Sequence, residues 1–590
     1  MKMNRCNCNC REQRMPPRTP QALPIGQANI YPLGEPHAVS VSLPTWDSVI
    51  GLSRKEKWLL DQLEWSYPRF HINKPVQELA EAVLTRLQIT ARNDQTSDNG
   101  ITTKCMVFAS ATAALDFIEA LKRSDEEHSR SPLETIRFFM PAESNERGLA
   151  GPHWANFSAV LLGSNLWKEA MAFWRDTGSG LSTRHAEYIL TEFDHLDSDC
   201  LATPAFRTPA PKKRGCQDGS CREIPHSLRG IRAAASSVSE LRSFLARLAS
   251  SDRPGEPSVH ADDVFLYPNG MNAIYSLSES LAGTDSTVAA FGWLYPETVN
   301  VLRRGTWGCC LSYKLGNEEE LRCLEEALRS GQQIRALFCE LPSNILLSSP
   351  DLRRLRALAV RYGFIIVCDD TVAGFVNLDA LPLVDVMVSS LTKTFSGASN
   401  VTGGSLVLNP SSRHHQTLKT ALATYHSKYP IKYFPLDAET LLENSKDIVW
   451  RVRQCNANTL PLVDLLRAHP SIATVHHPST APTSHLYTAM MRKGGGYGNV
   501  LSIVFHDPRS AEHFYNVLHV CKGSSFGANF TLAIPYVQLA NYWNREKVPK
   551  YGVPGHIIRL SVGLEDVDGL VDTVGRALKE VEVLEGRRNR

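Results

Sequence analysis

Short apolar segments alternate with helical segments from about residue 260 to residue 410, and this alternation constrains the fold more than any other feature. The strand-like runs are STVAAFG, IRALFCELP, FIIVCDD, VDVMVSSLTK and GGSLVLN. Helical periodicity separates them, as in SPDLRRLRALAVRYG, where Ser349 is a suitable N-cap and Pro350 fits the first turn. Short strands joined by helices are typical of a parallel sheet with helices on both faces. The sequence therefore predicts an α/β fold.

Polar residues follow two of these strand-like segments. FIIVCDD ends in Asp369 and Asp370, and VMVSSLTK ends in hydroxyl side chains and Lys393. Lysine is rarely buried, so a lysine at the end of a core strand requires a specific partner or role. Parallel sheets bind ligands at the carboxyl ends of their strands. The two segments therefore predict a carboxylate and a lysine on the same rim of the sheet.

The remainder of the chain divides into regions of different character. Residues 1–30 are polar and rich in proline, which predicts disorder. Residues 31–95 contain two helical segments and a polar linker and are expected to form an N-terminal arm. Residues 96–410 are assigned to the large domain, with a flexible insertion at about 196–255. Residues 411–590 are predicted to form a smaller α+β domain.

The composition is that of an ordinary globular protein. Hydrophobic residues make up 43% of the chain, and a net charge of +2 gives no general attraction to nucleic acid or acidic surfaces. No apolar stretch reaches the roughly 18 residues of a membrane span. The first twenty residues lack the apolar core of a signal peptide. The fourteen cysteines are scattered, which favours reduced thiols and a cytoplasmic location, with neither nucleic acid nor membrane as a partner.

Three site chemistries lack the motifs that they require. Cys6, Cys8 and Cys10 of CNCNC have no second cysteine or histidine pair to complete a zinc site, so no metal site is predicted. A nucleotide hydrolase needs a glycine-rich loop that ends in Gly-Lys-Ser/Thr, whereas Thr392 precedes Lys393. No His-Glu-x-x-His pair supports a zinc peptidase. A cofactor that binds lysine covalently is the remaining chemistry.

Pyridoxal 5'-phosphate needs a lysine for its aldehyde, an acid for its ring nitrogen and donors for its phosphate. A lysine in a dry site is a competent nucleophile and forms an imine with an aldehyde. Ser390 and Thr392 place hydroxyls beside Lys393. Gly270 and Met271 open a predicted helix, where free N–H groups attract an anion. The sequence thus contains a candidate for every group that this cofactor requires.

Six sequence elements, in the right order, resemble the Cys/Met-metabolism family of fold-type I PLP-dependent enzymes, and within it the fungal branch of cystathionine γ-synthases. The elements are YPRFHINKPVQELAEAV from Tyr67, GM at 270–271, ELPSN at 340–344, CDDT at 368–371, S-x-T-K at 390–393 and RLSVGLED at 559–566. The resemblance implies a mostly parallel seven-stranded sheet, pyridoxal phosphate as cofactor and an amino-acid substrate. It also implies a homodimer or homotetramer with shared sites, because Tyr67 and Arg69 resemble residues that bind the cofactor phosphate of a neighbouring subunit.

The resemblance further implies roles for individual residues. Lys393 would bind the cofactor and then move protons at the substrate, and Tyr295 would stack on the cofactor ring and assist. Asp369 would pair with the ring nitrogen. The residues assigned to substrate binding are Arg559, which would bind the α-carboxylate through paired hydrogen bonds, Ser525 and Asn344.

Three segments depart from the family pattern. GASN at 397–400 replaces Gly-His-Ser-Asp, Asp370 replaces the usual asparagine, and SFG at 525–527 replaces Ser-Leu-Gly. The interval between Arg69 and Gly270 is also far longer than in compact relatives. Much of this interval is therefore an insertion, and the sequence assigns no function to it.

The reaction that the resemblance implies is a γ-replacement. An O-acylated homoserine would lose its acyloxy group and take up a thiol, and with cysteine this gives cystathionine, as in transsulfuration and methionine biosynthesis. Two alternatives stay open: the same chemistry with sulfide or a carbon nucleophile in a specialised pathway, and a non-catalytic paralogue that acts as a binding protein. The presence of Lys393, Asp369 and Arg559 together favours an enzyme.

Overall fold

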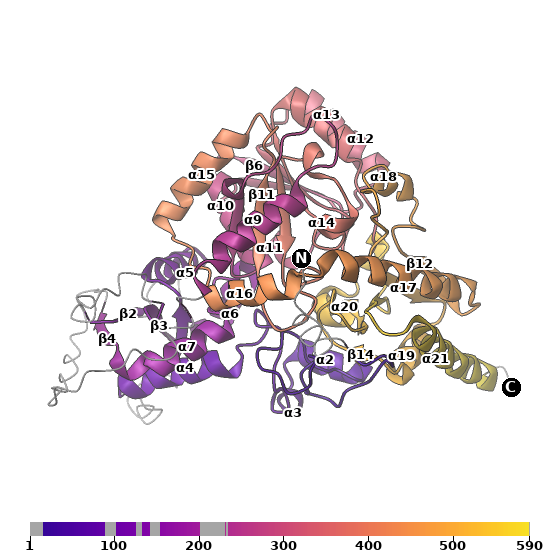
Figure 1. Ribbon diagram of the computed structural model, residues 1–590, viewed down its shortest axis with the longest axis horizontal. Helices are drawn as coiled ribbons and strands as arrows, with labels where there is room; N and C mark the ends of the chain where they lie inside the picture. The colour runs from indigo at the N-terminus through magenta and orange to yellow at the C-terminus, as the bar shows by residue number, and fades with distance from the viewer. Residues whose placement is uncertain are drawn as a thin grey trace, which may run out of the picture. The chain divides into compact units, whose positions relative to one another are not determined.

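The computed structural model describes residues 16–88, 102–124, 133–141, 154–200, 231 and 234–588, and the chain divides into two compact units (Figure 1). The first unit consists of Met1–Tyr67, Leu241–Leu422 and Thr440–Arg590, and the second of Pro68–Glu240 and Ala423–Glu439. None of the helices in the described ranges is long and apolar enough to cross a membrane. The CNCNC segment lies outside the described residues.

A seven-stranded sheet forms the centre of the first unit. Its strands are β5 (Val264–Tyr267), β6 (Thr287–Phe291), β7 (Cys309–Tyr313), β8 (Ala336–Glu340), β9 (Ile365–Asp369), β10 (Val386–Ser390) and β11 (Gly404–Leu408). Their spatial order is β5-β11-β10-β9-β8-β6-β7. Strand β11 runs antiparallel to both of its neighbours, and all other pairs are parallel. The predicted mostly parallel seven-stranded sheet is confirmed.

Helices connect these strands, and α10 packs against β11, next to which it is labelled in Figure 1. The connecting helices are α10 (Gly270–Leu281), α11 (Pro296–Arg304), α12 (Glu318–Arg329), α13 (Leu352–Tyr362) and α14 (Gly374–Asn377). The N-cap of α13 is Asp351, whose side chain accepts a hydrogen bond from the backbone N–H of Arg354. The prediction of Ser349 as the cap was wrong, because the helix begins after the next good capping residue along the chain.

A second sheet, of five strands, lies in the C-terminal part of the same unit. Its strands are β12 (Ile472–His476), β13 (Val500–Phe505), β14 (Cys521–Lys522), β15 (Leu532–Pro535) and β16 (Ile558–Ser561). The helices of this region are α17 (Ile448–Ala468), α18 (Ser484–Thr488), α19 (Pro508–Val517), α20 (Tyr536–Ala540) and α21 (Val567–Arg588). Buried side chains of α17, α19 and α21 share one core with the sheet, so the predicted α+β region is confirmed.

The N-terminal segment from residue 16 to Tyr67 packs on this five-stranded sheet of its own chain. It contains α2 (Trp46–Arg54) and α3 (Lys57–Leu60). Its buried Leu43 joins the core of the sheet, and the backbone N–H of Leu43 donates to the carbonyl of Lys522 at 3.1 Å. Residues 16–30 were predicted to be disordered, but they bury Leu23 and Ile30. The prediction rested on the average polarity of the segment, but a few apolar side chains are enough to pack it against the sheet.

The second unit has a sheet of its own, with the order β1-β3-β2-β4 and only antiparallel pairs. Its elements are α4 (Lys74–Arg86), β1 (Thr103–Phe108), α5 (Ala111–Ser124), β2 (Glu134–Phe139), β3 (Phe157–Gly163), α6 (Trp167–Thr177), α7 (Thr183–Glu192) and β4 (Asp197–Cys200). The assignment of residues 96–410 to one domain would place these strands in the same domain as the seven-stranded sheet. They form a separate sheet. Periodicity finds strands but does not show which sheet each strand joins.

Three of the four points at which the chain passes between the units lie within helices, and the fourth lies between Tyr67 and Pro68. The three helices are α9 (Ser237–Ala249), α15 (His415–Lys428) and α16 (Pro435–Ser445). The predicted flexible insertion at about 196–255 includes β4 and α9, which are regular elements. Residues 201–230 of that segment lie outside the described residues.

Candidate active site

Three parallel strands end at the same rim of the large sheet, each in a polar residue. Glu340 ends β8, Asp369 ends β9 and Ser390 ends β10. Glu340 pairs in register with Asp369, and Asp369 with Val388 of β10. Lys393 lies in the turn that follows β10. The structure therefore brings the predicted carboxylate and lysine to one rim.

Lys393 is partly buried, and a hydroxyl and two aromatic rings surround its amine. The Nζ atom donates a hydrogen bond to Ser525 Oγ at 3.0 Å. It also lies 4.3 Å from the ring centroid of Tyr67 and 5.2 Å from that of Phe526. Aromatic faces attract the charged amine while limiting its access to water. Ser525, which was predicted to bind substrate, thus contacts the lysine directly.

Arg559, on β16, lies close to the same Ser525 and is only 4% exposed. Its Nη1 donates to Asn344 Oδ1 at 3.1 Å, and its Nη2 donates to the carbonyl of Ser525 at 2.9 Å. Burial lowers the pKa of Arg559 to about 10, against the opposing effects of Tyr536 and Tyr295. No carboxylate in the described part of the chain forms an ion pair with this guanidinium. A buried guanidinium without a carboxylate partner favours the binding of an anionic ligand.

Ser525 therefore links the two cations of the site. Its hydroxyl accepts the hydrogen bond from Lys393, and its carbonyl accepts the one from Arg559. The ring of Phe526 lies between them, 5.2 Å from Lys393 Nζ and 4.9 Å from Arg559 Cζ. The three predicted residues Lys393, Ser525 and Arg559 consequently belong to a single site.

Glu340 connects two more of the predicted site residues. One carboxylate oxygen accepts the backbone N–H of Tyr295, and the other accepts that of Asn344 at 2.9 Å. Burial raises the pKa of Glu340 to about 8, and the neighbouring Asp369 acts in the same direction. Sequence reasoning missed this connection. The available signal was that Glu340 ends an apolar strand in the same way as Asp369.

The two adjacent aspartates at the end of β9 have different partners. Asp369 accepts a hydrogen bond from the backbone N–H of Thr371 at 2.9 Å, and burial raises its pKa. Asp370 accepts a hydrogen bond from the Ser389 hydroxyl of β10, and burial raises its pKa to about 7. Asp370 thus ties β9 to β10, whereas Asp369 ends the strand at the rim beside Glu340.

The N-terminus of α10 lies against the end of β10. Asn269 caps this helix by accepting the backbone N–H of Asn272 at 3.0 Å. A methyl group added to Gly270 would lie 2.9 Å from Cβ of Ser390, so the backbone approaches Ser390 closely. A helix N-terminus beside the lysine-bearing strand is a suitable place for a phosphate group.

Two other residues predicted to bind the cofactor are buried beside this helix start. The thioether of Met271 lies 3.9 Å from the hydroxyl of Thr298 on α11. The hydroxyl of Thr392 accepts the backbone N–H of Gly403 at 3.1 Å, which holds the turn before Lys393 against the start of β11. The site combines a lysine, an acid on the neighbouring strand and a helix N-terminus, and this donor set fits pyridoxal phosphate.

Tyr67 and Arg69, which were predicted to bind the cofactor phosphate of a neighbouring subunit, have different partners within their own chain. Tyr67 lies beside Lys393 of its own chain, because the preceding residues pack on the C-terminal sheet of that chain. Arg69 belongs to the second unit, where its Nη1 donates to the carbonyl of Arg175 at 2.6 Å. The role of Tyr67 and Arg69 at the site of a neighbouring subunit stays a prediction.

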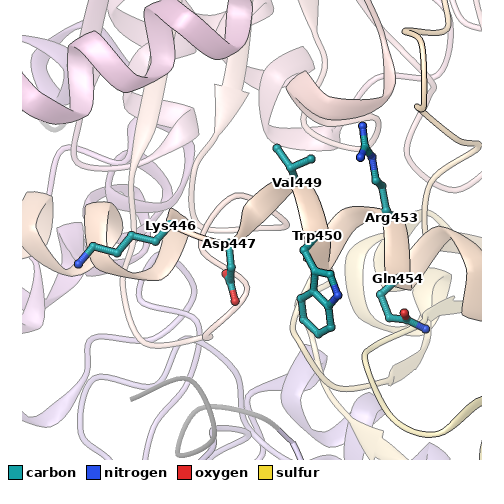
Figure 2. A pocket seen from close by; sticks show the side chains of 6 residues that line it. All are labelled: Lys446, Asp447, Val449, Trp450, Arg453 and Gln454. Carbon is teal, nitrogen blue, oxygen red and sulfur yellow. The ribbon is translucent and has the colours of Figure 1, made fainter. Parts of the chain in front are cut away.

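A different pocket opens at the start of α17 and is shown in Figure 2. Its lining residues are Lys446, Asp447, Val449, Trp450, Arg453 and Gln454. None of the residues predicted for the active site lines this pocket. Within the described ranges, no three or more His, Cys, Asp or Glu side chains are grouped so that they could hold a metal ion.

The large parallel sheet, the lysine on its rim and the acid on the adjacent strand define a PLP-dependent enzyme of fold type I. Comparison with known families agrees: the model described as "Cys/Met metabolism PLP-dependent enzyme" matches residues 259–579. The chain belongs to this family, and its cofactor is pyridoxal phosphate. A second model, "Fungal trans-sulfuration enzyme, N-terminal domain", matches residues 75–182. The long interval before Gly270 is therefore largely a domain in its own right.

Known relatives are similar over almost the whole chain. The "Cystathionine gamma-synthase-like protein ankD" of Aspergillus thermomutatus is 42% identical, with 94% of each chain covered. The "Cystathionine gamma-synthase" of Neurospora crassa is 31% identical, with 94% of this chain and 99% of that protein covered. Among solved structures, cystathionine γ-lyase CalE6 from Micromonospora echinospora is 26% identical with a TM-score of 0.51, and the match covers 58% of this chain and 86% of that chain.

Proposed function

We propose that this enzyme catalyses γ-replacement on an O-acylhomoserine with the thiol of cysteine, giving cystathionine and the free carboxylic acid. The observation that carries the proposal is the linkage of Lys393 and Arg559 through Ser525. A base and a buried cation thereby stand in one site, as an amino-acid substrate requires. The name of the Neurospora relative supports the choice of cystathionine as product.

Arg559 would bind the α-carboxylate of the homoserine ester. The carboxylate would complete the partners of a buried guanidinium that otherwise contacts the Asn344 side chain and backbone carbonyls. Paired charge-assisted hydrogen bonds fix both the position and the plane of a carboxylate. Asn344 would hold the guanidinium in that plane, while Glu340 holds the backbone of Asn344.

Lys393 would move the protons of the reaction. When bound, pyridoxal phosphate supplies an electron-withdrawing ring that stabilises the negative charge left on the substrate. The lysine amine would remove the proton from Cα, and a further proton leaves from Cβ before the γ-acyloxy group departs as a carboxylate. The cysteine sulfur would then form its bond to Cγ, and Cα and Cβ would regain their protons. Tyr295, fixed through its backbone N–H by Glu340, would assist these transfers.

The remaining predicted residues would hold the cofactor. Gly270 and Met271 at the start of α10 would bind the phosphate through backbone N–H groups, together with the hydroxyls of Ser390 and Thr392. Asp369 would accept a hydrogen bond from the protonated ring nitrogen and keep the proton on that nitrogen, and a bound cation beside its buried carboxylate would favour the ionised form of Asp369. We also propose that Tyr67 and Arg69 bind the cofactor phosphate of a neighbouring subunit, as their resemblance to family residues implies.

The proposal is tested by incubating the purified holoenzyme with O-acetyl- or O-succinyl-homoserine and either cysteine or sulfide. Cystathionine, identified by mass spectrometry, is expected with cysteine at a higher kcat/KM than homocysteine with sulfide. Lys393→Ala serves as the inactive control. Homocysteine as the main product would make sulfide the nucleophile, and no product from any pair would overturn γ-replacement of these esters by a sulfur nucleophile.

We further propose a homodimer or homotetramer in the cytoplasm that serves methionine biosynthesis. The assembly is checked by light scattering on the purified holoenzyme, with a monomeric mass as the result against it. The location is checked by imaging a fluorescent fusion. The pathway is checked by deleting the gene, which should create a methionine requirement that cystathionine relieves.

A further inference from the structure

The side chain of Arg451, in the first turn of α17, is 3% exposed, and every one of its donors has an acceptor within the protein. A guanidinium carries five N–H donors. They reach Asp447 Oδ1 (2.7 Å), the carbonyls of Thr394 (3.1 Å), Phe395 (2.8 Å) and Asn444 (3.1 Å), and Asn529 Oδ1 (3.1 Å). With all five donors occupied by the protein, Arg451 is available neither to substrate nor to cofactor.

Two of these acceptors, Thr394 and Phe395, directly follow Lys393 in the chain. The same turn is closed by the backbone N–H of Gly397, which donates to the carbonyl of Lys393 at 2.9 Å. Gly397 has a φ of +68°, and a methyl group at this residue would lie 2.2 Å from Nη1 of Arg451. The lysine turn therefore packs against the guanidinium so closely that only glycine fits.

Arg451 also contacts the turn that carries Ser525. Its acceptor Asn529 belongs to that turn, and the backbone N–H of Asn529 donates to the carbonyl of Gly397 at 2.7 Å. A methyl group on Gly527 would lie 2.4 Å from the backbone nitrogen of Thr394, so the two turns are in direct contact. One guanidinium thus joins the turn of Lys393 to the turn of its hydrogen-bond partner.

We infer that Arg451 is a positioning residue, which fixes Lys393 relative to Ser525 and hence relative to the carboxylate-binding Arg559. The inference rests on the proposed role of Lys393 as the proton carrier. The bond from Nε to Asp447, which lines the pocket of Figure 2, holds the guanidinium to its own helix start while the other nitrogens reach the two turns. A lysine at position 451 has three donors on one atom and cannot span both turns.

The test compares Arg451→Lys with Arg453→Lys, a change on the same helix at a residue that donates to the carbonyl of Gly494 and contacts neither turn. Misplacing a catalytic group by about 1 Å costs up to roughly a hundredfold in rate. We expect Arg451→Lys to lower kcat about 10- to 100-fold and to change KM for the acylhomoserine less than about threefold, since Arg559 is untouched. The pH midpoint of the visible absorption band of the lysine-bound cofactor should also shift, whereas Arg453→Lys should match the wild type.

Asn529→Ala provides a second variant if Arg451→Lys does not fold, because it removes one of the five acceptors and keeps the arginine. Asn529→Ala should lower kcat about three- to tenfold. It should also shift the pH midpoint of the absorption band in the direction measured for Arg451→Lys. The absorption measurement needs no turnover, so it tests the inference even if the proposed reaction fails. A folded Arg451→Lys or Asn529→Ala holoenzyme whose kcat and absorption midpoint equal those of Arg453→Lys overturns the positioning role.

Discussion

Replacement of Arg559 tests how the substrate is oriented. The guanidinium of Arg559 is buried and held in place by Asn344 Oδ1 at 3.1 Å and the carbonyl of Ser525 at 2.9 Å. In the proposed complex it forms two charge-assisted hydrogen bonds to the substrate carboxylate, and each such bond contributes about 1.5–3 kcal/mol. Arg559→Ala removes both and should cost at least about 3 kcal/mol. This corresponds to a loss of roughly a hundredfold or more in kcat/KM for the acylhomoserine.

Arg559→Lys should recover little of this loss. An ammonium group restores the charge, but it cannot bond Asn344, Ser525 and both carboxylate oxygens from one atom. If it retains one of the two substrate bonds, the remaining deficit of about 1.5–3 kcal/mol corresponds to roughly 10- to 150-fold in kcat/KM. Both variants should keep the visible absorption of the bound cofactor, because Lys393 and α10 are unchanged.

The assay is steady-state cystathionine formation, with cofactor content measured by absorbance on the same samples. Arg467→Lys, an exposed arginine on α17, serves as the control and should behave as the wild type. If Arg559→Ala instead loses the cofactor, and the reconstituted protein has the wild-type kcat/KM, then Arg559 supports the fold and the proposed substrate orientation is wrong.

Three further predictions follow from the site and its surroundings. Lys393→Ala should abolish turnover and the attachment of cofactor by borohydride; attachment that persists, detected by mass spectrometry, would exclude Lys393 as the cofactor lysine. Gly270→Ala places a methyl group 2.9 Å from Cβ of Ser390 and should weaken cofactor affinity about tenfold in a binding titration, whereas Gly575→Ala, with open space around it, should not. Burial raises the pKa of Glu565 from 4.5 to about 7, so the folded state binds the extra proton between these pH values and the free energy of unfolding falls as pH rises. Glu565→Gln should remove this dependence, so parallel Tm–pH curves for the two proteins would contradict it.

The large sheet and its rim could be predicted because their signals are local in sequence. Buried parallel strands appear as continuous apolar runs, and Asp369 ends one of them while Lys393 follows the end of another by three residues. Gly270 and Met271 could likewise be placed at the start of a helix from the residues around them. Each of these inferences needs only the preferences of neighbouring residues and the rule that parallel strands end on the same side.

The other parts of the site depend on contacts between residues that are distant in sequence. Lys393 meets Ser525 across 132 positions, and Arg451 meets Phe395 across 56. No specific partner of Glu340 was evident from the sequence. In the structure its carboxylate accepts a hydrogen bond from the backbone N–H of Tyr295. The position of Tyr67 beside Lys393 of the same chain was likewise not evident from the sequence.

The sequence by itself thus determined the class of the fold and, through motifs that resemble a known family, the cofactor, because hydrophobic periodicity and strand-end chemistry are properties of short segments. Only the tertiary structure decided that one turn joins the lysine to the arginine, that Arg451 fixes that turn, and that the strands before residue 200 form a separate sheet. Such arrangements depend on how elements dock, and docking is set by the packing of side chains from remote segments, which short-range patterns do not record.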